Sequence, residues 1–177
     1  VKQSGGTPRE FCTITVTDGI AMGHEGMKSS LISREVIADS AELTVRGHCY
    51  DALVGIAGCD KSLPGLMMSM LRLNVPSVFI YGGSILPGKF KGKDVTVVDV
   101  FEAVGKHSSG KMSSEELREL ELVACPSAGA CGGQFTANTM ACVSEAIGLA
   151  LPYSAGTPAP YEERDKYAFE SGQAVMN

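Results

Sequence analysis

The segment Cys59-Asp60-Lys61 joins a soft and a hard metal ligand at one point of the chain. A thiolate suits iron-sulfur clusters or zinc, whereas a carboxylate is a hard oxygen ligand that suits Mg²⁺. One pocket holding two kinds of metal would explain the pairing. The residues alone leave a plainer interpretation open: Cys59 as a buried structural thiol, and Asp60 with Lys61 as a solvated ion pair that stabilises little. Composition by itself favours the ion pair.

A second candidate, Cys131, lies in the glycine-rich segment 125–133, just before a helix expected to begin near Phe135. Glycines let the backbone approach a bulky group, and a helix N-terminus lowers the pKa of a nearby thiol. Cys131 is therefore a possible second cluster ligand, with a structural thiol as the alternative. Two cysteines do not complete a cluster site, which takes three or four protein ligands. The remaining cysteines are interpreted as inert: Cys12, Cys49, Cys125 and Cys142.

Two further polar residues lie in a glycine-rich loop between residues 18 and 26. Asp18 directly precedes Gly19, and such a pair taken alone is most often a turn. His24 has no second histidine at metal-binding spacing, so we expect it to form hydrogen bonds within the loop.

Short apolar runs alternate with helical patterns along the chain, which predicts an α/β fold with a parallel sheet and flanking helices. We treat residues 1–177 as a single α/β domain portion, incomplete at both ends. The strands are expected at 13–16, 52–57 and 77–81. The helices are expected at 31–46, 64–73, 97–106, 135–151 and 161–176, with a further helix that starts at a capping box of Ser113 and Glu116.

Helical periodicity also places apolar side chains together on one face of each of two predicted helices. One apolar stripe contains Ile32, Val36 and Leu43, and a second contains Met140, Val143 and Ile147. The group Met67, Met68 and Met70 is expected to pack in the core.

The loops after the three predicted strands carry the unusual residues. Because parallel strands release their loops at one edge of the sheet, Asp18-Gly19, Cys59-Asp60-Lys61 and Gly82-Gly83 are expected to converge there. Ligands bind at such edges. Sequence patterns alone thus predict an α/β protein with a possible metal site.

The composition narrows the class of partner. The chain has 177 residues, 44% of them hydrophobic and 20% charged, and a net charge of -5 that is spread along the sequence. Neither a nucleic-acid footprint nor a basic membrane-binding surface is visible, which favours a small-molecule partner. No apolar run approaches the roughly 20 residues of a membrane-spanning helix. The first residues lack a signal-peptide core, so a soluble intracellular protein is expected.

Four longer segments resemble, in the same order, motifs of the dihydroxy-acid and sugar-acid dehydratase family. They are Thr17 to Met27 (TDGIAMGHEGM), Ser33 to Ser40 (SREVIADS), Gly58 to Gly65 (GCDKSLPG) and Gly129 to Met140 (GACGGQFTANTM). Four long motifs in one chain are highly specific. The similarity covers essentially the whole chain but only an N-terminal-to-central stretch of the family.

This resemblance implies a set of ligands. Cys59 and Cys131 would bind an iron-sulfur cluster, either [2Fe-2S] or [4Fe-4S]. Asp18 and Asp60 would bind Mg²⁺, and Lys61 would join them through a carbamate on its side-chain nitrogen. The third cluster cysteine is expected upstream of Val1. A further Mg²⁺ carboxylate and the catalytic base, a serine, are expected downstream of Asn177, so no catalytic base is assigned within the chain.

The implied activity is elimination of water from a 2,3-dihydroxy carboxylic acid to give a 2-keto acid in the synthesis of valine, leucine and isoleucine. A related sugar-acid dehydratase and a non-catalytic α/β scaffold are the alternatives. The resemblance favours a homodimer at full length, in the cytoplasm of a bacterium or in a plastid or mitochondrion of a eukaryote. The 177-residue chain alone is expected to be inactive.

Overall fold

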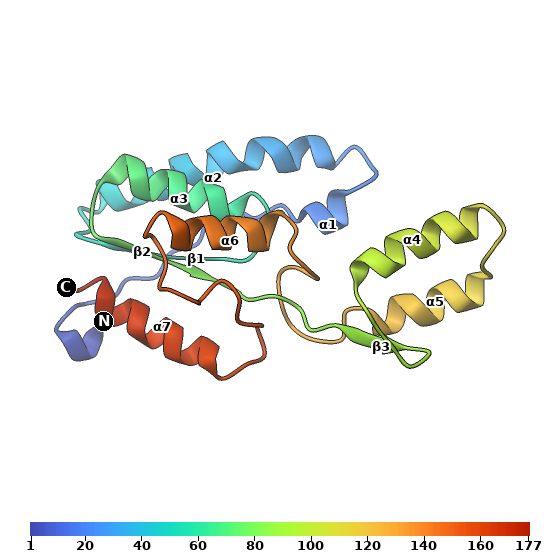
Figure 1. Cartoon of the computed structure of the whole chain (residues 1–177). Coiled ribbons are helices and arrows are strands. Elements are labelled where there is room, and N and C mark those ends of the chain that lie inside the picture. Colours follow the sequence, from blue (N-terminus) through green and yellow to red (C-terminus); the bar gives the residue numbers. More distant parts are fainter.

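The computed structural model describes all residues, 1–177, and its centre is a pair of parallel strands (Figure 1). Strand β1 (Leu53–Ala57) pairs with β2 (Ser77–Tyr81), in register from Leu53 opposite Ser77 to Ala57 opposite Tyr81. Both strands consist largely of apolar residues, as expected of a sheet covered on its faces. The predicted α/β class, with its parallel sheet and flanking helices, is confirmed.

Four helices pack around these strands. Figure 1 shows α2 (Met27–Gly47), α3 (Ser62–Leu73) and α6 (Thr136–Ala146) on one side, and α7 (Glu163–Ala174) on the other. They enclose one core of 15 buried residues, in which Ile37, Leu63 and Phe79 are almost fully shielded. Met67 and Met70 belong to this core, which confirms the prediction for them, whereas Met68 is only half-buried and lies outside the core cluster.

A smaller unit extends from the main body (Figure 1). It contains the hairpin of β3 (Gly88–Phe90) and β4 (Lys93–Val95), followed by α4 (Val97–Ser108) and α5 (Ser114–Val123). Its own core consists of Val95, Ala103, Leu120 and Ala124. The sequence analysis missed the hairpin, because strands of three residues are too short to display an alternating pattern.

The helix caps of this unit differ from the predicted ones. Ser113 accepts a hydrogen bond from the Glu116 N–H at 3.1 Å, as a capping residue should, but the Glu116 carboxylate pairs with Lys91. The reciprocal capping box is found instead at the start of α4, where Thr96 and Asp99 hold each other's backbone N–H groups.

The predicted first strand, residues 13–16, is wrong. The segment is extended but has no strand partner, Ile14 is 51% exposed, and Thr13 donates or accepts a 2.5 Å hydrogen bond with Ser40 of α2. A segment with a β-type sequence forms no sheet when no other strand lies beside it to pair with. Before it comes a short 3-10 turn, η1 (Lys2–Ser4), and after it the one-turn helix α1 (Asp18–Ala21).

The apolar stripe predicted on α2 is not the buried face of this helix. Ile32, Val36 and Leu43 are 64%, 50% and 71% exposed. The buried face is built mainly from small residues, namely Ser30, Ser33, Ala38 and Ala41, with Ile37 and Val45. Helix α3 lies so close that a Cβ added to Gly65 would be 2.8 Å from the Arg34 carbonyl oxygen. Close helix packing of this kind favours small side chains over the larger apolar ones.

The apolar stripe predicted on the helix that corresponds to α6 is only partly buried. Val143 and Ile147 are 37% and 54% exposed, whereas Met140 packs against the core. The helix ends at Ala146, earlier than predicted, and the Leu149 N–H returns to the Ser144 carbonyl at 2.8 Å. No helix of this structure is both long enough and apolar enough to cross a membrane.

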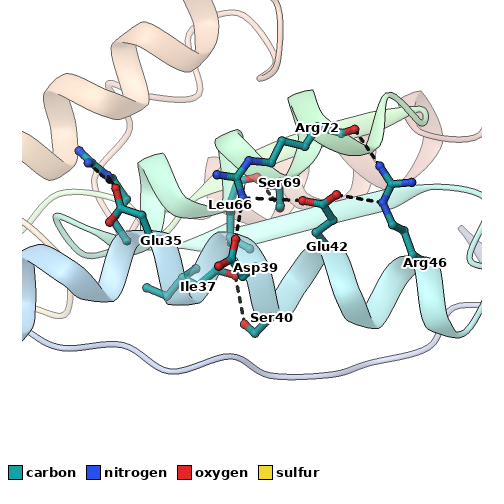
Figure 2. Close-up of polar contacts among 10 residues, drawn as sticks. Glu35, Ile37, Asp39, Ser40, Glu42, Arg46, Leu66, Ser69 and Arg72 are labelled. Atoms are coloured by element: carbon teal, nitrogen blue, oxygen red, sulfur yellow. Dashed lines mark hydrogen bonds and ion pairs between the residues drawn. The ribbon is translucent and has the colours of Figure 1, made fainter.

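Charged side chains link the outer surfaces of α2 and α3 (Figure 2). Arg72 forms ion pairs with Asp39 at 2.7 Å and with Glu42 at 3.7 Å. Arg46 bonds to Glu42 at 2.9 Å and donates to the Arg72 carbonyl at 3.2 Å. We call these four residues the surface network. Its side chains are 23–64% exposed, so it lies in contact with water.

Candidate functional site

The turn that follows β1 carries the first group of candidate residues. The Cys59 carbonyl accepts the N–H groups of Ser62 and Leu63 at 3.0 and 3.1 Å, which starts α3 directly after the turn. The Ser62 hydroxyl accepts the Cys59 N–H at 3.1 Å and donates to the Cys59 carbonyl at 2.9 Å. This serine therefore fixes the backbone on both sides of the Cys59 side chain.

Asp18 reaches the same place from α1. It is the first residue of that helix, and one of its carboxylate oxygens accepts a hydrogen bond from Ser30 of α2. Ser30 is fully buried, so its hydroxyl has a fixed position from which to hold the Asp18 carboxylate.

Asp18, Asp60 and Lys61 form a compact charged group, which we call the buried trio. The Lys61 ammonium contacts the Asp60 carboxylate directly and lies 3.8 Å from an Asp18 oxygen. The three side chains are only 17%, 10% and 16% exposed in the order Asp18, Asp60, Lys61. An ion pair of Asp60 and Lys61 is therefore present, but the expectation that it is solvated is wrong.

The two carboxyl groups of the trio have opposite pKa shifts. Burial and the neighbouring Asp60 raise the pKa of Asp18 above its usual value. Burial also acts to raise the pKa of Asp60, but hydrogen bonds from Asp18, Lys61 and Thr136 outweigh it, so this pKa is lowered. The two acids thus differ in how readily they carry charge, and a cation placed between them would relieve their repulsion.

The second cysteine lies in a loop that packs against the first. A Cβ added to Gly58 would lie 3.0 Å from the Cβ of Ala130, which places the residues before Cys59 and Cys131 in contact. The Ala130 N–H donates to the Gly83 carbonyl at 2.9 Å, and the Cys131 carbonyl accepts the Ile85 N–H at 2.8 Å. Cys131 is 6% exposed, whereas Cys59 is half-buried, with its thiol 3.9 Å from the Val16 carbonyl.

The three predicted loops do converge at the carboxyl ends of the strands. The Gly82 N–H donates to the Ala57 carbonyl at 2.9 Å, so the end of β2 adjoins the Cys59 turn. Lys61 contacts Asp18 and so joins the first loop to the second. Asp18 arrives through the helix α1 rather than from the end of a strand.

The chemistry of the donor atoms matches two kinds of metal. Oxygen donors of Asp18 and Asp60 suit a hard cation, and thiols on two adjoining loops suit a soft one. No group of three or more His, Cys, Asp or Glu side chains is arranged to hold a metal ion. A buried hydroxyl without a hydrogen-bond partner, that of Tyr81, belongs to the same core cluster as Cys131.

Several supporting residues escaped the sequence analysis. Ser30, Ser62 and Thr136 hold the predicted site residues, but serine and threonine are common in loops and at helix starts. Only the position of Ser62, three residues after Cys59, indicated a local side-chain to backbone bond. Tyr81 gave no signal beyond its place in an apolar strand.

The other predicted site features have mixed outcomes. His24 does form loop hydrogen bonds: one ring nitrogen lies 2.7 Å from the Ile20 carbonyl, and the other accepts the Gly26 N–H at 3.0 Å. The four remaining cysteines are exposed as residues. The sulfur of Cys125 is nevertheless partly shielded from water, which raises the pKa of its thiol. That these four thiols are inert stays a prediction.

A shallow hollow borders the site. It has a volume of about 420 Å³ and is lined by residues of the Asp18 loop, including Val16, Thr17 and His24. A larger hollow of about 580 Å³, around Glu162 and Lys166, contains none of the candidate residues. The hollow beside the Asp18 loop is the smaller one, but it is the better candidate because the side chains next to it can bind a metal.

Two acids, a lysine and two thiols lie at the carboxyl ends of the parallel strands of an α/β fold. This arrangement places the protein in the class of α/β proteins with a candidate metal centre. Residues 1–177 match the family described as dihydroxy-acid/6-phosphogluconate dehydratase N-terminal. This chain belongs to that family.

Individual relatives give the same result. The chain is 91% identical over 177 residues to a dihydroxy-acid dehydratase of Pelagibacter ubique and 83% identical to one of Parvibaculum lavamentivorans. It is 57% identical to a dihydroxy-acid dehydratase of the more distant Sulfurisphaera tokodaii. In each case the whole chain is covered, but it spans only 31–32% of the relative's length.

Proposed function

We propose that this chain is part of a hydro-lyase that removes water from a 2,3-dihydroxy carboxylic acid and releases a 2-keto acid. The observation that carries the proposal is the buried trio of Asp18, Asp60 and Lys61 next to Cys59. The relatives that match the chain along its whole length are named dihydroxy-acid dehydratases. The implied products are the keto-acid precursors of valine, leucine and isoleucine.

Asp18, Asp60 and Lys61 are proposed to hold Mg²⁺. An ammonium group repels a cation, so Lys61 would serve only after its neutral amine has added CO₂ and lost a proton, which gives a carbamate with anionic oxygens. The position of Lys61 supports this proposal, because its nitrogen already lies against both carboxylates. Ser30 would orient Asp18 through its hydrogen bond.

Cys59 and Cys131 are proposed to hold an iron-sulfur cluster, completed by a cysteine outside this chain. When bound, the cluster and Mg²⁺ supply Lewis acids for the 3-hydroxyl on one side and for the carboxylate and 2-hydroxyl on the other. The contact between Gly58 and Ala130 supports the pairing, because it brings the two cysteine loops together. Ser62 would keep the Cys59 backbone in place.

The reaction needs no change of oxidation state in the protein. A base takes the proton from C2, the C–O bond at C3 breaks, and hydroxide leaves with a proton as water. The resulting enol becomes the 2-keto acid by tautomerisation. The residues of this chain would bind and orient the substrate carboxylate and hydroxyls, while the base is proposed to lie beyond Asn177.

A second candidate is a sugar-acid dehydratase with the same metals. The family description supports it, since it includes 6-phosphogluconate dehydratases. The segment 136–140 and the sequence from Lys61 to Gly65 favour the branched-chain substrate by their resemblance. The third alternative, a scaffold without catalysis, predicts that no metal or cluster binds.

The test uses a full-length protein that carries this segment, reconstituted without oxygen with iron, sulfide and Mg²⁺. Dihydroxyisovalerate and a sugar acid are supplied separately, and 2-keto acid is measured. Turnover of dihydroxyisovalerate is expected, with Cys59→Ser and Cys131→Ser each losing cluster absorbance and activity. Cys49→Ser, which changes an exposed thiol remote from the turn, is the matched control and should keep both.

Other results would point elsewhere. Turnover of the sugar acid alone would favour the second candidate, and absence of a cluster in the unaltered protein would favour the scaffold. We expect the 177-residue chain alone to form no keto acid, because the base, the third cysteine and a further carboxylate are proposed to lie outside it. The full-length protein is proposed to be a homodimer.

A further inference from the structure

One buried polar group near the site has no assigned task. Tyr81, the last residue of β2, is 1% exposed, and its hydroxyl has no hydrogen-bond partner. A buried hydroxyl without a partner destabilises the fold, because the hydrogen bonds that it made to water in the unfolded chain are not replaced. Such a group is retained in a core only where something else compensates for that cost.

Two polar residues border Tyr81, but each is already bonded elsewhere. The Arg164 guanidinium carbon lies 5.8 Å from the centre of the Tyr81 ring, and its N–H donates to the Ser154 carbonyl at 2.5 Å. The Asn138 amide donates to the Ala155 carbonyl at 2.9 Å. Burial raises the pKa of Tyr81, and the Asn138 amide approaches the Tyr81 oxygen closely enough to offset part of that rise. A donor to that oxygen still leaves the tyrosine proton itself without an acceptor.

Cys131 is a further polar residue of the same core. Cys131 and Tyr81 belong to the same buried core cluster, and both are less than 10% exposed. The chain beyond Tyr81 is tied to the Cys131 loop by the Ala130 N–H to Gly83 carbonyl bond and the Ile85 N–H to Cys131 carbonyl bond. The unpartnered hydroxyl of Tyr81 and the Cys131 loop therefore belong to one core and to segments that are bonded to each other.

We propose that the Tyr81 hydroxyl donates a hydrogen bond to the Cys131 thiolate when that sulfur ligates the proposed cluster. Tyr81 is then a positioning residue, since it acts through a ligand and touches no substrate. A thiolate in an apolar core needs a donor, and an unpartnered hydroxyl needs an acceptor. Hydrogen bonds to ligand sulfur atoms raise the reduction potential of an iron-sulfur cluster, because they stabilise the added negative charge.

The inference rests on the proposed cluster ligation by Cys131, and its test measures the cluster itself. Tyr81→Phe in the reconstituted full-length protein keeps the ring and removes only the hydroxyl. We expect a lower midpoint potential and a shifted sulfur-to-iron charge-transfer band. Tyr153→Phe is the control, because Tyr153 is 81% exposed, and it should leave both unchanged.

A second variant guards against a folding defect in the first. Fluorotyrosine at position 81 has a more acidic hydroxyl and is a stronger donor, so it should raise the potential. A loaded cluster with the same potential in both variants would overturn the role of Tyr81. An unaltered protein that takes up no cluster would instead refute the proposed ligation, and the role of Tyr81 with it.

Discussion

The buried trio and the surface network are built from the same kinds of residue but differ in charge balance. The surface network pairs two arginines, Arg46 and Arg72, with two acids and stays in contact with water. The trio sets two acids against one lysine, and all three side chains are at most 17% exposed. An exposed network with equal numbers of acids and bases needs no ligand. A buried group with more acids than bases is stabilised by a bound cation.

The largest effect is expected from removing one acid of the trio. Asp60→Asn in the full-length protein should lower dehydratase activity at least about 100-fold, because loss of a residue that only supports a metal ligand already costs 10–100-fold. Steady-state rates at saturating Mg²⁺ measure it. The matched variant Asp39→Asn removes an acid from the surface network and should leave activity unchanged; equal losses in both would remove the distinction.

Lys61 gives the next largest effect. Lys61→Arg keeps the positive charge but cannot form a stable carbamate, so Mg²⁺ should bind about 10–100-fold more weakly. Calorimetric titration of the unaltered protein with and without bicarbonate provides the second arm, and tighter binding with bicarbonate is expected. A Mg²⁺ affinity that changes neither with bicarbonate nor with the Lys61→Arg substitution would contradict the carbamate proposal.

Without Mg²⁺ the trio should make stability depend on pH in a particular direction. The raised pKa of Asp18 means that the folded state binds its proton more tightly than the unfolded state, so stability falls as pH rises above the usual value of 3.8. Asp18→Asn removes this penalty, so its melting temperature at neutral pH should be higher than that of the unaltered chain. Thermal unfolding of the metal-free 177-residue chain across pH 3–8 measures it.

The control for this pH effect is Asp60. Its lowered pKa contributes stability that is present at neutral pH and is lost as pH falls through that lowered value. Asp60→Asn should therefore shift the melting temperature downward at neutral pH. A shift of the same sign in both variants would contradict the opposite pKa directions.

The smallest effect is expected in the surface network. Arg72→Ala removes ion pairs of 2.7 and 3.7 Å whose partners are 64% and 23% exposed, so unfolding should become easier by less than about 1 kcal/mol. Urea unfolding at low and high salt measures it, and high salt should reduce the difference. A larger loss that resists salt would show that the network is structurally as important as the trio.

The sequence predicted the residues of the trio better than the elements that hold them. Asp60 stood out as a hard ligand beside Cys59 at a predicted strand end, whereas the grouping of Asp18 and Lys61 with it as ligands was implied only by the family resemblance. The strand predicted before Asp18 failed, since strand pairing depends on a neighbour elsewhere in the chain. Periodicity likewise grouped Ile32 and Val36 on one apolar face, whereas contact with α3 buries the face that contains Ser30 and Ala41.

The smaller unit has a consequence for the order of folding. The Ala130 to Gly83 hydrogen bond closes a loop through residues 84–129, whereas the backbone of Cys59 is held within its own turn by the N–H groups of Ser62 and Leu63. Closing a loop costs entropy that grows only with the logarithm of its length, so replacing the unit by a linker of a few residues would save about 2 kcal/mol. Cys131 should thus reach its place after Cys59, and pulsed hydrogen exchange should find the Ala130 amide protected later than that of Gly82.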